Sequence, residues 1–185
     1  AEESGNGFHL HHSVWREGRN LFAEKGKLSD LGRWWLGGLQ AAMRECSLIG
    51  STHPNAYRRR RRYSYAPTEA SWGHDNRTVA LRVIEGAGPE DDAPVRVEER
   101  HAAADCNPYL IAAVGLFAGL RGVRERIEPT RPTVGDGYAG EGGRPALPAS
   151  IGEAVALARG SALLEAWLGP EMLELVITNA EREAE

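Results

Sequence analysis

The sequence predicts an α+β fold, in which a small sheet is covered by helices. Two stretches, 78–84 and 95–101, alternate apolar and polar residues as half-buried strands do. Two others, 29–46 and 107–127, repeat apolar residues at helical spacing. Strands that share one polar face and are backed by helices on the other are typical of the α+β class.

The N-terminal stretch 8–15 also alternates and is predicted to be a strand. His9, His11 and Ser13 occupy alternate positions, so they should share one face of it. Residues 18–20, which read Gly-Arg-Asn, then predict a turn.

The helix predicted over 29–46 has Ser29 or Asp30 available as its N-cap. Its apolar stripe consists of Leu31, Trp35, Leu39 and Met43. Gly37 and Gly38 interrupt this helix and predict a place where another backbone packs closely against it.

No periodicity is visible from 50 to 67, so this proline-bracketed segment is predicted to be a loop. It carries five consecutive arginines at 58–62. Between the strands at 78–84 and 95–101, the Gly, Pro and Asp residues of 85–94 predict a turn region.

The helix predicted over 107–127 is the clearest element in the sequence, and Pro108 suits its first turn. Its predicted core-facing residues are Leu110, Val114, Phe117 and Leu120. The Gly- and Pro-rich stretch 129–148 should be an irregular surface loop.

Two helices are predicted in the C-terminal part of the chain. One begins at Ser150, with Glu153 in the capping-box position. The other follows Gly169-Pro170 and continues to the end.

Composition restricts the function classes. The 185 residues are 42% hydrophobic and 26% charged, with a net charge of −4 and a pI of about 5.9, which argues against a general nucleic-acid or membrane binder. No apolar run approaches the roughly 20 residues of a membrane helix. Cys46 and Cys106 stand far apart, which predicts free thiols and a cytoplasmic location.

Three predicted strands carry polar residues suited to one common pocket. These residues are His9, His11 and Ser13 on the first strand, Arg77 and Arg82 with the second, and Arg96, Glu98 and Arg100 on the third. Arginine grips oxyanions with a planar, permanently charged fork. A carboxylate inside a cationic frame suits a hard metal ion. The pattern therefore predicts a site for a metal, phosphates and a carboxylate.

Each motif taken singly has a plainer interpretation. A His-x-His pair on a strand is more often a polar face than a metal site. An Arg-x-Glu-x-Arg strand is most often a solvated face with cross-strand ion pairs. The functional interpretation depends on the motifs occurring together and in order.

Five ordered segments together resemble the glutamine synthetase family. They are SGNGFHLHHS at 4–13, NAYRR at 55–59, DNRTVALRV at 75–83, RVEER at 96–100 and DCNPYL at 105–110. The resemblance implies an antiparallel curved sheet that is part of the family's catalytic barrel, with residues 1–185 forming a partial catalytic domain. Because the chain opens with Ala1 and runs directly into a strand, we expect a fragment that lacks the small N-terminal domain and the first half of the catalytic domain.

The resemblance also implies roles for individual residues. His9 and Glu98 would ligate Mg²⁺ or Mn²⁺, and His11, Ser13, Arg82 and Arg96 would contact ATP. Gly5, Arg59, Arg77 and Arg100 would bind glutamate, while Arg77 and Arg82 would neutralise the phosphoryl group during transfer. The implied reaction is ATP-dependent ligation of an amine to the γ-carboxylate of glutamate through γ-glutamyl phosphate. The full-length protein would be a ring-shaped homo-oligomer, and the isolated chain should be inactive because part of the metal shell is missing.

One departure from the family pattern concerns the amine. Ammonia-using members carry Gly-Tyr-Glu-Ala-Pro where this chain reads YSYAP at 63–67, so Tyr65 stands in place of the glutamate. A neutral tyrosine cannot hold ammonium electrostatically, whereas its ring can pack against a larger amine. Together with WGHDNRT at 72–78, this resembles the γ-glutamylpolyamine and γ-glutamylamide branch and favours an organic amine.

Two further features differ from the family pattern. The arginine run 58–62 can be a solvated loop, an enlarged anion clamp or an RNA-binding element. Tyr138 lies roughly where some bacterial members carry a modifiable tyrosine, but its Gly-rich surroundings differ, and adenylylation is not expected.

Three alternative functions remain open from the residues. The chain could belong to a non-catalytic relative that only binds ligands, or to an Arg-rich RNA-binding module with salt-dependent affinity. It could also be a zinc hydrolase using His9, His11 and His12, although on a strand His12 should point away from the other two.

Overall fold

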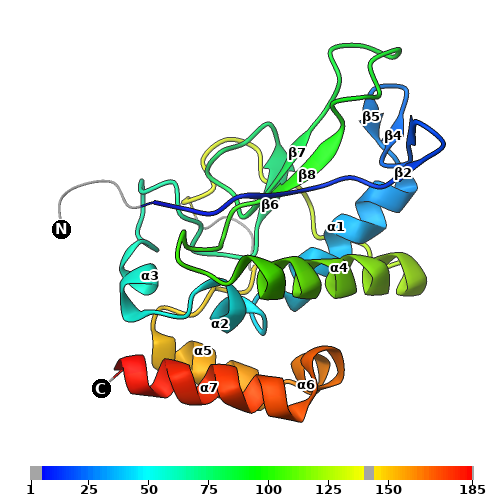
Figure 1. Cartoon of the computed structure of the whole chain (residues 1–185). Coiled ribbons are helices and arrows are strands. Elements are labelled where there is room, and N and C mark those ends of the chain that lie inside the picture. The colour runs from blue at the N-terminus through cyan, green and yellow to red at the C-terminus, as the bar shows by residue number, and fades with distance from the viewer. Residues whose placement is uncertain (1–5, 140–143, 185) are drawn as a thin grey trace.

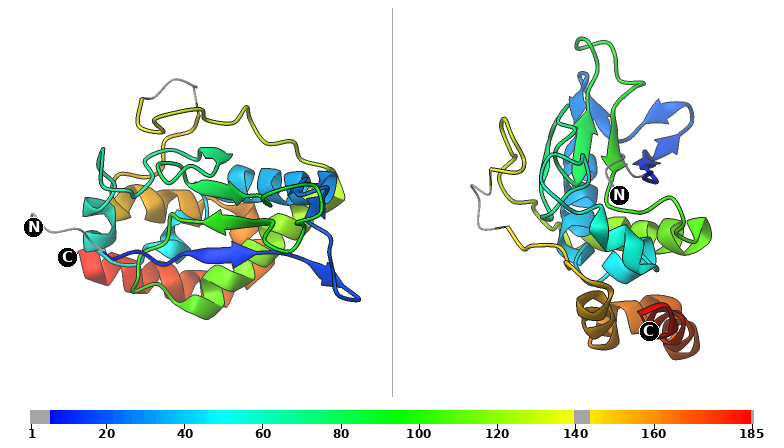
Figure 2. Two further views of the ribbon diagram at one scale, coloured as in Figure 1. Left: turned by 90° about the horizontal axis from the view of Figure 1, so that it is seen from above. Right: turned by 90° about the vertical axis from the view of Figure 1, so that its left-hand side faces the viewer.

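The computed structural model describes residues 6–139 and 144–184. They are arranged in tiers, with a small sheet above, helices α1 and α4 beneath it, and helices α5 to α7 at the base (Figure 1). The α+β class predicted from the sequence is confirmed. The views in Figure 2 show that α1 and α4 lie along one side of the sheet, while α5 and α7 lie beneath them.

The main sheet has four strands in the order β1-β8-β7-β6. They are β1 (Leu10–His12), β8 (Arg96–Glu99), β7 (Leu81–Ile84) and β6 (Trp72–His74). Glu98 in the central strand β8 is opposite His11 of β1 on one side and Arg82 of β7 on the other. The register therefore places three polar side chains from three strands in one row.

The sheet differs from the predicted antiparallel one in a single pairing. β1, β8 and β7 are antiparallel neighbours, but β6 pairs with β7 in parallel. The chain returns from the end of β6 to the start of β7 through residues 75–80. The strands within the described residues form no closed barrel.

The predicted strand 8–15 is interrupted. Only β1 joins the sheet, and the chain then leaves it in two short hairpins. The first joins β2 (Trp15–Arg16) to β3 (Arg19–Asn20), and the second joins β4 (Ala23–Glu24) to β5 (Lys27–Leu28). Glu17 and Gly18 both adopt positive φ angles at the first turn, which reverses the chain close to the predicted position.

Helix α1 (Asp30–Ala42) begins at the predicted cap, where the Ser29 side chain accepts a hydrogen bond from the Gly32 amide. It ends four residues earlier than the predicted 46, because the chain turns after Met43 and enters the short helix α2 (Ser47–Gly50).

The close packing predicted at Gly37 and Gly38 is confirmed. A Cβ atom on Gly38 would lie 2.1 Å from the Ala118 carbonyl oxygen of α4, and one on Gly37 would lie 2.0 Å from the Ile127 oxygen. Only glycine lets the two backbones approach so closely.

Helix α4 (Pro108–Glu125) has the predicted start, with Asn107 capping the Tyr109 and Leu110 amides. The predicted core face was partly wrong, because Phe117 is 40% and Leu120 53% exposed. The buried residues are Ile111, Val114, Gly115, Ala118, Gly119 and Gly122. Small residues occupy the contact with α1 because the two helices pack almost backbone to backbone.

The remaining helices refine the predicted pattern. A short helix, α3 (Pro54–Arg58), lies within the segment predicted to be a loop. The helix predicted from Ser150 is divided at Gly160-Ser161 into α5 (Ile151–Arg159) and α6 (Ala162–Leu168). Ser161 starts the second one by accepting a hydrogen bond from the Leu164 amide. Helix α7 (Pro170–Ala184) follows as predicted.

The described part of 129–148 contains no helix and no named strand, as expected for a surface loop. Among the described residues, no helix combines the length and apolarity needed to cross a membrane.

Candidate active site on the open face of the sheet

Glu98 lies at the centre of the sheet face that points away from α1 and α4. Arg100 donates a hydrogen bond from Nη1 to Glu98 Oε1 at 2.7 Å, and Arg82 donates one from Nη1 to Oε2 at 3.2 Å. His9 Nδ1 lies 2.9 Å from Oε1. The carboxylate is thus shared by side chains from two neighbouring strands and from the segment preceding β1.

A second pair extends this row of side chains towards the edge of the sheet. The Arg96 Nε atom donates to His11 Nδ1 at 3.1 Å. Ser13 lies beyond the end of β1 and accepts a hydrogen bond from the Trp15 indole at 3.0 Å. Side chains predicted for metal and nucleotide binding therefore come from the neighbouring strands β1 and β8 and the residues next to them.

The electrostatics of the face favour an ionised carboxylate and neutral imidazoles. Burial by itself would raise the pKa of Glu98, but the charges of Arg100, His9 and Arg82 outweigh it and lower the pKa. Burial, reinforced by Arg100, lowers the pKa of His9. Burial likewise lowers the pKa of His11. Neutral imidazole is the form that binds metals.

The spacing of His9 and Glu98 fits a divalent cation. Two adjacent ligands of an octahedral Mg²⁺ ion at about 2.1 Å lie about 3.0 Å apart. The 2.9 Å between His9 Nδ1 and Glu98 Oε1 matches that spacing. No cluster of three or more His, Cys, Asp or Glu side chains suited to a metal occurs among the residues described. These two donors fit two corners of a metal site and require further ligands from elsewhere.

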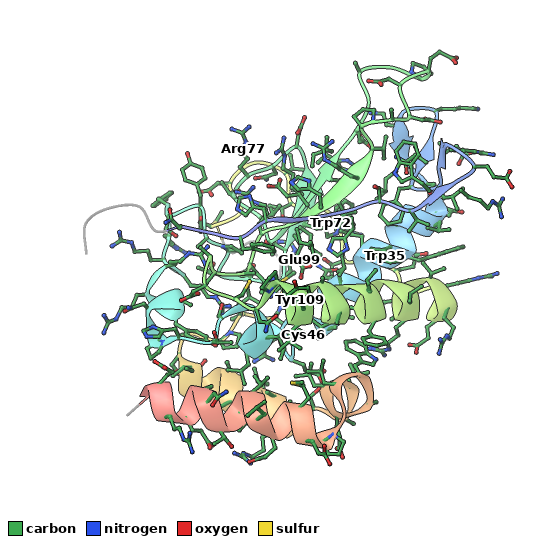
Figure 3. The ribbon with its side chains drawn as sticks, viewed as in Figure 1. Trp35, Cys46, Trp72, Arg77, Glu99 and Tyr109 are labelled. Carbon is green, nitrogen blue, oxygen red and sulfur yellow. The ribbon has the colours of Figure 1, made fainter. Side chains whose placement is uncertain are left out.

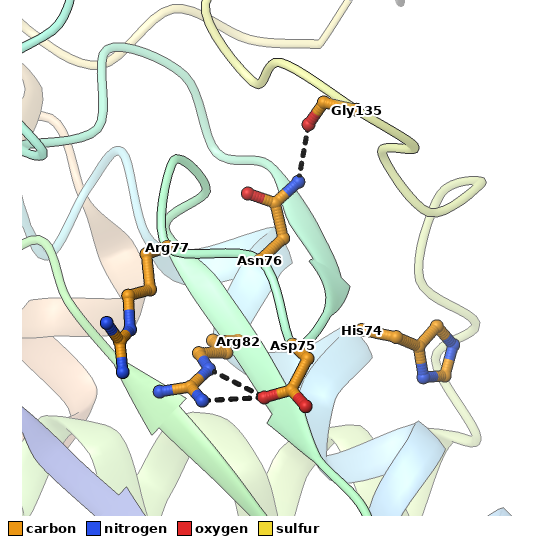
Figure 4. A pocket seen from close by; sticks show the side chains of 6 residues that line it. All are labelled: His74, Asp75, Asn76, Arg77, Arg82 and Gly135. Carbon is orange, nitrogen blue, oxygen red and sulfur yellow. Dashed lines mark hydrogen bonds and ion pairs between the residues drawn. The ribbon is translucent and has the colours of Figure 1, made fainter.

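Beside Glu98, a hollow of about 630 Å³ opens over the turn between β6 and β7. Its lining consists of His74, Asp75, Asn76, Arg77, Arg82 and Gly135 (Figure 4). Arg82 donates to Asp75 Oδ1 from Nη2 at 2.6 Å and from Nε at 3.2 Å. Its guanidinium is thus held between Asp75 and Glu98, with the hollow beside it.

Arg77 lies in the turn before β7, next to the predicted strand 78–84, and it is exposed. It nevertheless lines the same hollow as Arg82, and Figure 4 shows both side chains directed to one side of the turn. The Asn76 amide fixes this turn by donating to the Gly135 carbonyl at 2.8 Å.

The residues predicted to hold the glutamate α-carboxylate contact the surroundings of His9. Arg100 is 5% exposed and donates to Glu98. Arg59 donates to the Ala102 carbonyl at 3.2 Å, and its Nη2 atom lies 2.9 Å from where a Cβ on Gly7 would be. Gly5 lies outside the described residues, and its role remains a prediction.

The arginine run does not act as one unit. Arg60 is directed inwards, where it donates to the Pro148 carbonyl at 2.8 Å and the Ser51 hydroxyl at 2.9 Å and stacks on the Tyr57 ring. Burial lowers its pKa to about 10. Arg61 and Arg62 are exposed. The prediction of a wholly solvated loop is therefore wrong for Arg60, which ties two loops together.

The segment 63–67 is a tight loop near the site. Tyr63 and Tyr65 both have positive φ angles, and the two residues are 75% and 64% exposed. The Tyr63 ring lies 5.7 Å from that of Tyr138, whose hydroxyl donates to the Ala66 carbonyl at 3.1 Å. Tyr138 is 4% exposed, so it anchors this loop.

Two side chains around the site had no role assigned from the sequence. Asp75 lies beside the motif arginines, but its bond to Arg82 depends on the turn between β6 and β7. Glu99 follows Glu98 on β8 and therefore lies on the opposite face, where it approaches Gly115 of α4. Figure 3 labels Glu99 just above α4. The alternation of β8 was a signal for Glu99, because it places a carboxylate at a core position.

The comparisons with known proteins agree with this arrangement. The family model of the glutamine synthetase catalytic domain matches residues 1–185. This chain belongs to the glutamine synthetase family. Its relatives carry the names of glutamine synthetases and of enzymes that join an amine to glutamate.

Several relatives come from the branch that uses organic amines. The chain is 40% identical over 173 residues to γ-glutamylethanolamide synthetase GlnA4 of Streptomyces coelicolor, covering 93% of this chain and 36% of the relative. It is 38% identical over 180 residues to glutamate–isopropylamine ligase of a Pseudomonas species, covering 94% and 38%. It is 38% identical over 159 residues to γ-glutamylputrescine synthetase PuuA of Escherichia coli, covering 84% and 32%.

A solved structure of the family shares the fold. The structure described as a GmaS/ADP complex superposes with a TM-score of 0.83 at 27% identity, covering 97% of this chain and 42% of that one. The chain thus spans less than half the length of the relatives it matches. The likeness to the γ-glutamylamide and polyamine branch, predicted from the sequence, is confirmed.

Proposed function

We propose that the gene product containing this chain joins an organic amine to the γ-carboxylate of glutamate, using ATP and Mg²⁺ or Mn²⁺. The single observation that carries the proposal is the Glu98 carboxylate, held by Arg82 and Arg100 and lying 2.9 Å from His9 Nδ1. Because the chain spans only 36% of a relative such as GlnA4, the activity is proposed for the gene product that contains it.

Within that site, His9 and Glu98 would hold the metal, which supplies charge neutralisation at the ATP phosphates when bound. His11, Ser13, Arg82 and Arg96 would contact the nucleotide. This assignment is supported by the bond between Arg96 of β8 and His11 of the neighbouring strand β1. We place the reaction in the cytoplasm and the gene product in a ring-shaped homo-oligomer, following the family resemblance.

The proposed reaction has two steps. A γ-carboxylate oxygen of glutamate bonds to the γ-phosphorus of ATP, and the bond from that phosphorus to the ADP oxygen breaks. The amine nitrogen then bonds to the acyl carbon, phosphate leaves with the electron pair of the carbon–oxygen bond, and the surplus proton of the amine passes to solvent.

The arginines would stabilise the charges of these steps. Arg59 and Arg100 would hold the α-carboxylate of glutamate, while Arg77 and Arg82 would face the phosphoryl group from the hollow that both line. Phosphoryl transfer depends mainly on positioning and charge neutralisation. Removing Arg82 or Arg77 should therefore raise the barrier by about 3 kcal/mol.

The proposal of an organic acceptor is supported by the loop 63–67. Tyr65 occupies the position of the ammonium-binding glutamate in the family motif, and the residue is 64% exposed. It offers an aromatic surface and no negative charge. Such a surface stabilises the carbon chain of an amine better than ammonium itself.

The test is an acceptor comparison on the gene product that contains this chain. Phosphate release with glutamate, ATP and Mg²⁺ is measured with ammonia, ethanolamine, isopropylamine or putrescine as the acceptor. An organic amine should give the highest kcat/KM. A clear preference for ammonia would overturn the organic acceptor, and the absence of release with every amine would favour a non-catalytic relative.

A pair of matched variants tests the role of Tyr65. Tyr65→Glu should raise the use of ammonia relative to the organic amine. Tyr63→Glu is the control, because Tyr63 has the same left-handed backbone and similar exposure but is not at the motif position. Equal effects of the two substitutions would contradict the assignment.

A further inference from the structure

A second charged cluster lies on the opposite face of the same strands. Glu99, on β8, meets two imidazoles, with His12 Nε2 3.1 Å from its Oε2 and His101 Nδ1 3.2 Å from its Oε1. Glu99, His12 and His101 are 5%, 6% and 1% exposed. The two imidazoles meet different oxygens of the carboxylate, so the three side chains do not converge on a point that a metal could occupy.

The cluster is enclosed by the helices beneath the sheet. A Cβ on Gly115 of α4 would lie 2.9 Å from the His12 ring and 3.4 Å from Glu99 Oε2, so this glycine makes room for the pair. The Trp35 ring of α1 lies 6.0 Å from the His12 ring. Burial would raise the pKa of Glu99, but His101 and His12 outweigh it and lower the pKa to about 2. A buried carboxylate is therefore kept ionised.

Charge at this position is not needed for burial as such. Well-packed apolar residues in place of a buried ion pair often leave stability unchanged or improve it. Burial alone therefore does not account for the cluster, and its role lies in the segments that it holds in place.

Strand β1 is the element that needs orienting. It lies at the edge of the sheet, spans three residues and pairs with β8 alone within the described sheet. Its neighbour His9 approaches Glu98 on the open face, while His12 reaches Glu99 on the buried face. Adjacent residues of β8 thus hold the β1 segment from both faces of the sheet.

We infer that Glu99 is a positioning residue, which acts through His12 to hold β1 against β8 and so keeps His9 in place beside Glu98. The expected effect on metal binding rests on the proposed function. The hold of Glu99 and His12 on β1 does not. Partners that orient metal ligands commonly change metal affinity 10–100-fold when mutated.

The experiment uses the 185-residue chain without metal and removes the contact between Glu99 and His12 by mutating each partner in turn. Glu99→Gln removes the charge on β8, and His12→Leu removes the partner on β1. The imidazole ¹⁵N shifts of His9 and the amide exchange of residues 10–12 are measured by NMR. Both variants should shift the His9 signals and speed β1 exchange on the order of 10-fold.

Ile177→Ala is the matched control, because Ile177 is 1% exposed in α7, at the base of the molecule. It should lower global stability and leave the His9 signals unchanged. The inference is overturned if both sheet variants fold with unaltered His9 signals, if Ile177→Ala shifts them equally, or if neither sheet variant folds. If only one folds, that variant decides.

A second readout separates this inference from the proposed function. Mn²⁺ binding is titrated by electron paramagnetic resonance on the gene product that contains this chain, and Glu99→Gln should weaken it about 10-fold. If that gene product binds no Mn²⁺ while the metal-free shift of the His9 signals is present in the 185-residue chain, the metal assignment fails and the positioning role stands.

Discussion

The Glu98 carboxylate and the His9 imidazole lie 2.9 Å apart on the open face of the sheet, with two arginines completing the surroundings of the carboxylate. Glu98 thus joins the N-terminal segment to the centre of the sheet. Because Arg100 is itself only 5% exposed, the group also contributes to stability.

Glu98→Gln should lower the free energy of unfolding by about 3 kcal/mol, because it leaves the buried Arg100 without its charged partner. Urea denaturation of the variant and of the unmutated chain measures this difference in the free energy of unfolding. Glu85→Gln is the control, since Glu85 pairs with the exposed Lys27 at 2.9 Å and should cost less than about 1 kcal/mol. If both variants lose the same free energy of unfolding, the ion pairs of Glu98 contribute no more than a surface ion pair does.

Gly38→Ala should destabilise the chain by about 3 kcal/mol or more, because its Cβ would lie 2.1 Å from the Ala118 carbonyl oxygen and force α1 away from α4. Gly152→Ala in α5 is the opposite case. The nearest atom to its Cβ would be 3.9 Å away, and replacing a helical glycine there should stabilise by about 0.5–1 kcal/mol. Thermal unfolding of the two variants should move in opposite directions, and a neutral Gly38→Ala would refute the close contact.

Arg60→Ala should cost about 2 kcal/mol, since two hydrogen bonds and the stacking on Tyr57 are lost. Arg61→Ala, at an exposed neighbour, should change stability by less than about 0.5 kcal/mol. The comparison is made by urea denaturation. If the two substitutions have the same effect, the inward placement of Arg60 is wrong.

Ionisation of Tyr57 should destabilise the fold at alkaline pH. The Tyr57 hydroxyl is buried and donates a hydrogen bond to the Ser51 carbonyl at 2.7 Å. Burial raises its pKa to about 12. The unfolded value is about 10, so the fold favours the neutral form, and this contribution is present below pH 10 and lost as the pH rises to 12. The loss should approach about 3 kcal/mol.

The measurement is urea denaturation at a series of pH values between 8 and about 12. Tyr57→Phe should cost about 1 kcal/mol at pH 8 and then show a shallower decline, because the titrating group is gone. Parallel pH profiles of the two proteins would refute the link between Tyr57 and alkaline unfolding.

The sequence by itself determined which residues share a face within one strand. Because strand side chains alternate, His9 shares a face with His11 at β1. For the same reason, Arg96, Glu98 and Arg100 share a face at β8, whatever lies beyond the strand. The sequence likewise determined the cap at Ser150 and limited the cap of α1 to Ser29 or Asp30, because capping depends on neighbours two or three positions away.

Only the tertiary structure decided which segments meet. The bond from Arg82 to Asp75 depends on a parallel pairing that no periodicity predicts. The exposure of Phe117 depends on how closely α4 approaches α1, and the burial of Arg60 depends on a loop that passes it at Pro148. Local patterns follow from bonds between near neighbours in the chain, whereas these contacts are fixed by packing between segments distant in sequence, so the local pattern does not contain them.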